Sequence, residues 1–150
     1  MSEAEAIGSV EVILRRIPPS TIDLDSTKSR HPEPGYRATS PRLSTKPGEQ
    51  GLSCSRLRQT SPQELLNQLS QDGIDPEGWL VCRIRVQDVL ALGLEVIHVP
   101  IDGRDSGHCE IRGKNGLDFP NAKSSKLARK SRILTAEEVS SLHAGDTLET

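Results

Sequence analysis

The residues of this chain best suited to acid–base chemistry are His108 and Glu110, which stand two positions apart beside a glycine-containing loop. In an extended strand, residues i and i+2 point to the same face. Arg112 continues that face, whereas Cys109 and Ile111 occupy the other. An imidazole beside a carboxylate could move protons to and from a substrate. The same residues could instead form a solvated polar face of a strand, which requires no special arrangement.

A second group combines an arginine, a serine and a glutamate from three candidate strands. Arg16 ends the first strand, Ser53 or Ser55 lies on the next, and Glu110 lies on a later one. This order resembles the Arg–Ser–Glu layout of ADP-ribosyltransferases, in which the Arg and Ser position NAD and the Glu stabilises the developing oxocarbenium ion. The resemblance covers three residue types, and the aromatic residues that usually stack on nicotinamide are not evident. It implies a nucleotide-directed enzyme.

Basic residues are concentrated toward the end of the chain. Positions 112–132 contain seven basic residues and one acid, whereas positions 137–150 contain four acids and neither lysine nor arginine. The segment 122–132 (AKSSKLARKSR) predicts a basic helix, with Leu127 and Ala128 on the packed side. Its outer arc could bind the phosphate backbone of nucleic acid or an acidic protein surface, or could be a solvated face. The candidate anion-binding residues are Lys123, Lys126, Arg129, Lys130 and Arg132.

Length and composition limit the possible classes. The 150 residues suffice for one domain. A hydrophobic share of 33% is below the usual globular value, and 2% aromatic residues predict a small aliphatic core. A formal net charge of −2 indicates no strong overall attraction to nucleic acid or membrane. The sequence has no glycine-rich phosphate loop, no HExxH motif and no GxSxG motif.

The three cysteines predict buried, reduced thiols. Cys54, Cys82 and Cys109 have no CxxC spacing, and each lies in a candidate strand beside apolar residues. A metal site combining a cysteine with His108 is the alternative, but we predict neither metal nor cofactor. The sequence has no signal-peptide pattern and no apolar run of about 18 residues, so we expect no membrane contact and a cytoplasmic location. The segments RRIPP, GLSCS, GHCEI and KLARKS resemble those of small bacterial proteins of unassigned function.

Alternating apolar residues predict strands at 10–17, 51–57, 80–86 and 108–112. In 80–86 the even positions should face the core, while Arg83 and Arg85 face solvent. The segment 94–99 is apolar on both faces and predicts a central strand. The loop 100–107 should join it to 108–112 as an antiparallel hairpin.

Capping residues predict the helices. Ser61, Pro62 and Glu64 form an N-terminal capping signal, and a helix from there should pack its leucines on the sheet and end at Gly73. A short helix over 87–92 should end at Gly93. Thr135, followed by Ala-Glu-Glu, begins another helix.

These patterns predict an α+β domain over 9–144, with a small, mostly antiparallel sheet and two or three helices packed on it. We also expect a flexible terminus (1–8) and a flexible acidic tail (145–150). The long Pro/Ser-rich loop (20–50) should be disordered without a function, or should be a segment that binds a partner. The leading function is a non-enzymatic accessory or adaptor protein that works through protein or nucleic-acid contacts. The alternative is a small enzyme that uses His108, Glu110 and Arg16. A cleft in which these side chains converge with a serine would favour the enzyme.

Overall fold

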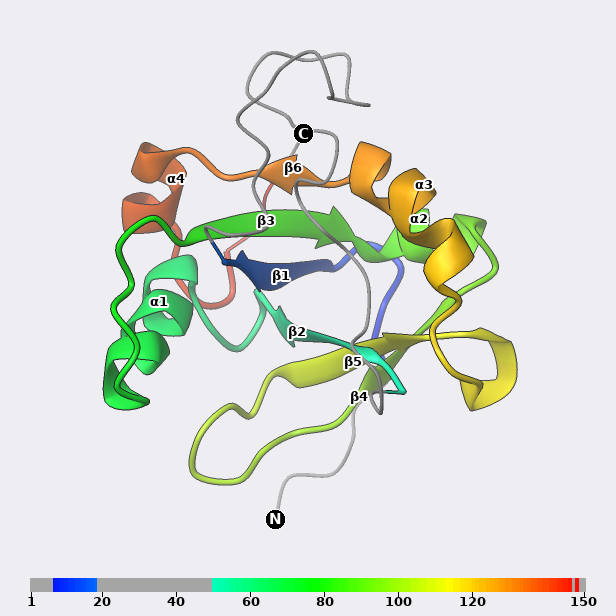
Figure 1. Cartoon of the computed structure of the whole chain (residues 1–150), viewed down its shortest axis with the longest axis horizontal. Coiled ribbons are helices and arrows are strands. Elements are labelled where there is room, and N and C mark those ends of the chain that lie inside the picture. Colours follow the sequence, from blue (N-terminus) through cyan, green and yellow to red (C-terminus); the bar gives the residue numbers. More distant parts are fainter. Residues whose placement is uncertain (1–6, 19–49, 147, 149–150) are drawn as a thin grey trace.

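The computed structural model describes residues 7–18, 50–146 and 148. The strands of this part form one antiparallel sheet in the order β4-β5-β2-β1-β3-β6 (Figure 1). The strands are β1 (Val12–Ile17), β2 (Leu52–Arg56), β3 (Leu80–Arg85), β4 (Glu95–His98), β5 (His108–Arg112) and β6 (Arg132–Ile133). The helices are α1 (Pro62–Gln71), α2 (Val86–Ala91), α3 (Ser124–Lys130) and α4 (Ala136–Ser141), with 3-10 turns η3 (Lys114–Gly116) and η4 (Asn121–Lys123).

The predicted α+β class and antiparallel sheet are confirmed, with four α-helices in the described residues instead of two or three. The predicted loop 20–50 lies outside the described residues except for its last position. The predicted terminus 1–8 and tail 145–150 lie partly outside them.

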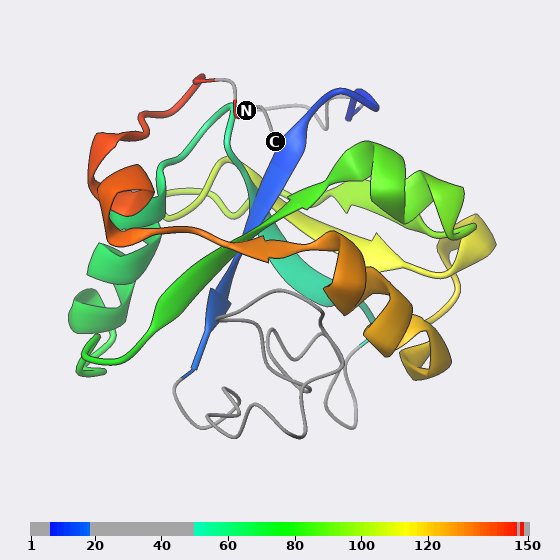
Figure 2. The ribbon, with the colours of Figure 1, turned by 90° about the horizontal axis from the view of Figure 1, so that it is seen from above.

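Helices cover both faces of the twisted sheet, with α1 and α4 on one side and α2 and α3 on the other (Figure 2). Under α2 and α3 the core contains Ile13, Cys82 and Ile111. Under α1 and α4 it contains Leu14 and Val81. The central strands are therefore buried on both faces, which alternation within one strand does not reveal.

Because helices cover both faces of the sheet, one prediction for 80–86 is wrong. Arg83 was expected to face solvent, but it is 6% exposed, and its Nη1 donates to the carbonyl of Lys130 at 3.2 Å. Arg85, at the end of β3, is half-buried and pairs with Asp88 at 2.9 Å. The prediction was wrong for Arg83 because β3 lies between β1 and β6, with cover on both faces.

The hairpin of β4 and β5 is confirmed, with His98 opposite Cys109, but the prediction that 94–99 is a central strand is wrong. β5 pairs with β2 on its other side, so β4 lies at the edge of the sheet. Its Val96 and Ile97 are only half-buried. An apolar run indicates that both faces of a strand are partly covered. It does not indicate whether the strand pairs with another strand on both of its edges, so it cannot separate a central strand from an edge strand.

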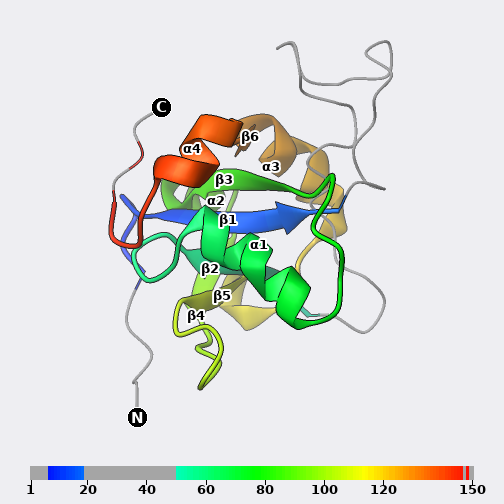
Figure 3. The same cartoon turned by 90° about the vertical axis from the view of Figure 1, so that its left-hand side faces the viewer.

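The start of α1 follows its capping signal. The Ser61 hydroxyl accepts a hydrogen bond from the Glu64 amide at 3.1 Å, and Pro62 occupies the first turn. Leu65 and Leu69 are buried, which fixes α1 on the sheet beside β1. The helix ends at Asp72, and Figure 3 shows α1 in front of the strands.

The predicted basic helix 122–132 is shorter than expected. α3 ends at Lys130, and Arg132 lies in β6, where it is opposite Arg83. Leu127 and Ala128 are buried as predicted. The Thr135 signal is confirmed as a capping box, in which Thr135 and Glu138 exchange side-chain and backbone hydrogen bonds. None of the described helices is long and apolar enough to cross a membrane.

The three cysteines are buried free thiols, as predicted. Cys54 and Cys109 face each other across β2 and β5, and Cys82 lies on β3 in the same core cluster. Burial raises the pKa of Cys54 and of Cys82 to about 12. These thiols therefore act as small core side chains and are poor nucleophiles.

Candidate functional site

The candidate site opens where two central strands separate. β1 and β2 pair only at Ile13 with Arg56 and at Leu14 with Ser55, although β1 continues to Ile17. Beyond Leu14, β1 pairs with β3 alone, and the start of β2 pairs with β5 alone. A cleft of about 380 Å³ lies at this divergence, between β1, β2, the first residue of β5, α1 and the β4–β5 loop.

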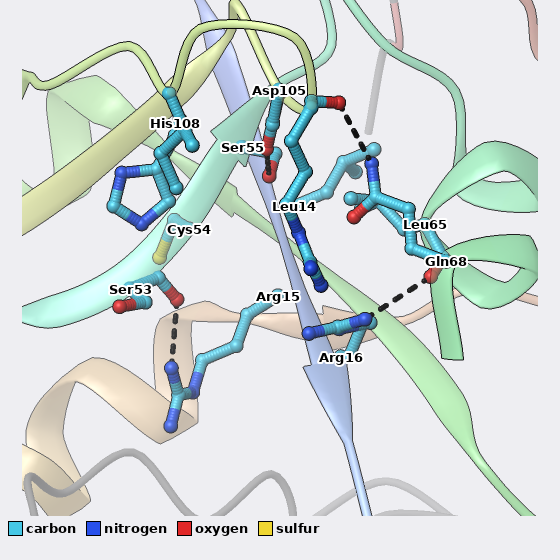
Figure 4. A pocket seen from close by; sticks show the side chains of 12 residues that line it. Leu14, Arg15, Arg16, Ser53, Cys54, Ser55, Leu65, Gln68, Asp105 and His108 are labelled. Carbon is cyan, nitrogen blue, oxygen red and sulfur yellow. Dashed lines mark hydrogen bonds between the residues drawn. The ribbon is translucent and has the colours of Figure 1, made fainter. Parts of the chain in front are cut away.

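Polar side chains from several segments meet in this cleft (Figure 4). Arg16 comes from β1, Ser53 and Ser55 from β2, and His108 from β5. Gln68 of α1 and Arg104 of the β4–β5 loop also line it, as do Arg15 and Asp105, and Leu14, Leu65 and Ile101 supply apolar wall. The site is therefore built from residues far apart in the sequence.

Two arginines of β1 are held by backbone carbonyls. Nη1 of Arg15 donates to the carbonyl of Ser53 at 2.7 Å, and so links the two strands where their ladder has ended. Nη1 of Arg16 donates to the carbonyl of Leu65 in α1 at 3.3 Å. Burial lowers the pKa of the Arg16 guanidinium, and the positive charges of Arg104 and Arg15 lower it further.

Among the described residues that line the cleft, Asp105 is the only acid, and both of its oxygens already accept hydrogen bonds. Oδ2 accepts from the Ser55 hydroxyl at 2.6 Å, and Oδ1 accepts from the Gly107 amide at 3.0 Å. Asp105 therefore shapes the β4–β5 loop. This direct Ser55–Asp105 bond has no histidine between its partners, so it is not a Ser-His-Asp relay.

The orientation of His108 is set by its own loop. Its Nδ1 lies 2.8 Å from the carbonyl of Val99, which can only accept, so Nδ1 carries a proton. In the neutral ring Nε2 is then an acceptor. Figure 4 shows the ring on the same side as Ser53, with Arg16 across the cleft.

Glu110 lies on the cleft face of the sheet but is not part of the cleft lining. It stands directly opposite Ser53, and Nε and Nη2 of Arg112 donate to its Oε1 at 2.8 and 2.6 Å. No hydrogen bond joins it to His108 in the described part of the chain. The predicted His108–Glu110 pair thus shares a face, but its members are held by different partners.

The Arg–Ser–Glu set predicted from the sequence shares one face of the sheet, but only Arg16 and Ser53 of the set line the cleft. The register places Arg16, Ser53 and Glu110 on one face of three neighbouring strands, β1, β2 and β5. No phenylalanine, tyrosine or tryptophan is among the described residues that line the cleft. The described aromatic residues lie elsewhere, with Phe119 in the core under α2 and α3 and Trp79 in the turn before β3.

The residues of the predicted basic helix separate into two groups. Lys126, Arg129 and Lys130 are exposed on α3. Lys123 donates to the carbonyl of Leu92 at the end of α2. Arg132 forms a two-pronged ion pair with Glu138, with both contacts at 2.8 Å. Only the first group presents its charges outward; we call these three residues the α3 patch.

Sequence reasoning missed a buried polar network at the other end of β2. The guanidinium of Arg56 is fully buried and donates to both oxygens of Glu11, at 2.6 and 2.8 Å. Its Nη1 lies 3.4 Å from Nδ1 of His98, whose Nε2 lies 2.8 Å from the carbonyl of Ser106. Because arginine only donates, Nδ1 accepts and the proton of His98 is on Nε2. The network ties Glu11, β2 and the β4–β5 hairpin together, which is a structural role.

Sequence reasoning also missed Arg104 and Gln68. The amide of Gln68 donates to the carbonyl of Arg104 at 3.4 Å, which ties the β4–β5 loop to α1. The sequence offers only a weak signal for them. Gln68 is a polar residue on a helix that packs leucines on the sheet, and Arg104 is a charged residue in the long hairpin loop.

No group of three or more metal-ligating side chains occurs in the described ranges. Comparisons of the chain with protein-family models, with curated proteins and with solved structures returned no match.

Proposed function

We propose that this chain is a small enzyme that acts on a nucleotide, with the Arg–Ser–Glu arrangement of ADP-ribosyltransferases. One observation supports it above the others. Arg16, Ser53 and Glu110, which the sequence places on separate segments, share a face on adjacent strands, and the first two line one cleft together with His108. Arg16, Ser53 and His108 line the same cleft, and Glu110 lies on the same face of the sheet but outside the cleft lining. A cleft that groups an arginine, a serine and a histidine supports an enzyme over a solvated strand face.

The chemistry assigned to each side chain follows from its position. Arg16 offers a guanidinium to phosphate oxygens, and Ser53 offers a hydroxyl beside it. Both hydrogen bonds from Arg112 reach Oε1 of Glu110, so Oε2 remains available to a substrate. A carboxylate at this place stabilises positive charge that develops on a ribose ring in the transition state.

In the proposed reaction the bond between the nicotinamide nitrogen and the ribose carbon of NAD breaks. Nicotinamide leaves with the electron pair, and the ribose carbon becomes an oxocarbenium ion. A nucleophile of the acceptor, or water, forms the new bond to that carbon and loses its proton. The Nε2 atom of His108, set by the Nδ1 contact to Val99, is placed to accept this proton.

The experiment is release of nicotinamide from NAD by the full chain. Glu110→Gln should abolish release and leave the urea-unfolding midpoint nearly unchanged, because the amide keeps the shape and removes the negative charge. Glu137→Gln, an exposed carboxylate on α4, is the matched control and should retain full activity. No release by the parent chain, or full release by Glu110→Gln, would contradict the proposal.

A second candidate function is a non-enzymatic accessory or adaptor protein, and the α3 patch favours it. Lys126, Arg129 and Lys130 are exposed, and no ion pair links them to an acid in the described part of the chain. Neighbouring cations on a helix repel one another, and an anionic partner relieves that repulsion. The partner would be an acidic protein surface or the phosphate backbone of nucleic acid.

For either function we propose a cytoplasmic location. The three free thiols support a reducing compartment, because cysteines in oxidising compartments usually pair.

A further inference from the structure

We propose that Arg104 and Arg16 form a diphosphate-binding subsite in the cleft. In the free protein Asp72 forms an ion pair with Arg104, and a phosphate group of the ligand takes the place of Asp72 on binding. The inference rests on the proposed function and names the part of the substrate that the cleft holds. Both arginines line the cleft, one from the β4–β5 loop and one from β1. The charge of Arg104 acts on Arg16, so the two guanidiniums lie close enough for one anion to contact both.

Arg104 is paired, but its partner is outside the cleft lining. Nη1 donates to Oδ1 of Asp72 at 2.9 Å, and Nη2 donates to Oδ2. Asp72 caps the C-terminus of α1. The side chains of this pair are 44% and 32% exposed, so water screens their attraction and the pair is easily exchanged.

The charges within the cleft favour an anion. In the part of the chain that the structure describes, three guanidiniums line it, from Arg15, Arg16 and Arg104, and the one lining acid, Asp105, is already engaged by Ser55 and Gly107. Burial and then the charge of Arg104 lower the pKa of Arg16, while the charges of Asp72 and Asp105 oppose the shift only in part. A phosphate placed between the two arginines would oppose that shift further.

The form of the ligand follows from size and donor geometry. A guanidinium binds phosphate oxygens through two parallel hydrogen bonds, so two of them match two neighbouring phosphate groups. The cleft volume of about 380 Å³ is within the range of small-molecule sites and exceeds the needs of a single phosphate. Ser53 and His108 at the other side then face the sugar that the diphosphate carries.

Calorimetric binding of ADP, inorganic phosphate and adenosine to the full chain tests this subsite. ADP should bind, phosphate should bind more weakly, and adenosine should not bind. Arg104→Gln and Arg16→Gln should each weaken ADP binding by about tenfold or more. Asp72→Asn should tighten it several-fold, because it frees Arg104. The matched controls are Arg85→Gln and Asp88→Asn, which break an ion pair away from the cleft and should leave ADP binding unchanged.

Arg104→Gln should weaken ADP binding and Asp72→Asn should tighten it, and a purely structural ion pair would not give these opposite effects. If Arg104 and Asp72 only fasten the loop to the helix, both substitutions weaken ADP binding, and that result overturns the inference. Unchanged ADP binding in Arg104→Gln, or no binding by the parent, also overturns it. Should Arg104→Gln fail to fold, Asp72→Asn alone decides by the sign of its effect. If the parent chain binds ADP but releases no nicotinamide, the subsite stands and the proposed enzyme is rejected. If the parent chain releases nicotinamide but Arg104→Gln binds ADP as the parent does, the enzyme stands and the subsite is rejected.

Discussion

Gly51 lies against Glu110: a Cβ atom built on Gly51 would be 2.7 Å from Oε1 and 2.9 Å from Cβ of that glutamate. The second contact is to the base of the side chain, which cannot swing away. Only a glycine at this position therefore lets Glu110 stand beside Ser53.

The first prediction follows from this contact. Gly51→Ala should lower nicotinamide release by roughly 10- to 100-fold, because it displaces Glu110 and a misplacement of about 1 Å can cost about 100-fold in rate. It should also lower the free energy of unfolding by about 1–3 kcal/mol through overpacking. Gly8→Ala, whose Cβ would meet nothing closer than 3.9 Å, is the control. Wild-type stability in Gly51→Ala would show that the strand can shift to make room.

A second prediction concerns the buried pair of Arg56 and Glu11. Arg56→Met should lower the free energy of unfolding by about 3–5 kcal/mol, because Glu11 and His98 lose their buried partner. Adding Glu11→Gln should restore part of the loss. Arg85→Met, from the more exposed pair with Asp88, should cost no more than about 1 kcal/mol. Urea titration measures all three, and equal losses in Arg56→Met and Arg85→Met would refute the burial argument.

A third prediction is loss of stability in acid. The hydrogen bond from Arg132 lowers the pKa of Glu138 from 4.5 to about 2, with burial opposing the shift. Since the folded pKa is the lower one, the unfolded chain binds more protons, and the contribution is present above pH 4.5 and is lost as pH falls toward 2. After discounting for solvent we expect about 2 kcal/mol. Glu138→Gln should remove this pH dependence and Glu137→Gln should keep it; identical acid profiles would exclude Glu138 as the source.

The fourth prediction tests the α3 patch. If it binds nucleic acid, it should contact phosphates without sequence preference, and log affinity should fall with log salt by about 0.7–0.9 per phosphate neutralised. The double variant Lys126→Glu, Lys130→Glu should flatten that slope and keep the fold, because both side chains are exposed. Lys114→Glu, also exposed, serves as control. Absence of binding by the parent at low salt would exclude this role for the patch.

The fifth prediction concerns the thiols. Burial keeps Cys54 and Cys82 protonated at neutral pH, since their pKa is raised to about 12. A thiol reagent should therefore label the native chain only as fast as the sheet opens, and labelling should accelerate with urea. Rapid labelling of Cys82 without denaturant would contradict its buried position.

Local signals in the sequence predicted local structure. Ser61 and Thr135 mark helix starts because a cap depends on residues three positions apart. The alternation around Cys109 predicted a strand and the side that faces the core. The central place of 94–99 and the exposure of Arg83 were wrong because they depend on strand order, which no single strand contains.

The candidate site was predicted in part for the same reason. Arg16, Ser53 and Glu110 could be grouped by residue type, and the sheet register brings them to one face. Arg104 could not be found, because its contact with Asp72 spans 32 positions and depends on how a loop folds against a helix. Glu11, Arg56 and His98 likewise meet only after three separate segments have docked.

The central position of β1 has a consequence for how the chain folds. Leu14 pairs with Ser55 and Ile13 pairs with Ile84, so β1 meets its short β2 ladder only when residue 55 has been synthesised and its longer β3 ladder only when residue 84 has been. Such distant pairings cost loop entropy before they give stability, which slows folding. During synthesis β1 therefore has at most the short β2 ladder, and we expect the ribosome or a chaperone to protect it until β3 is complete.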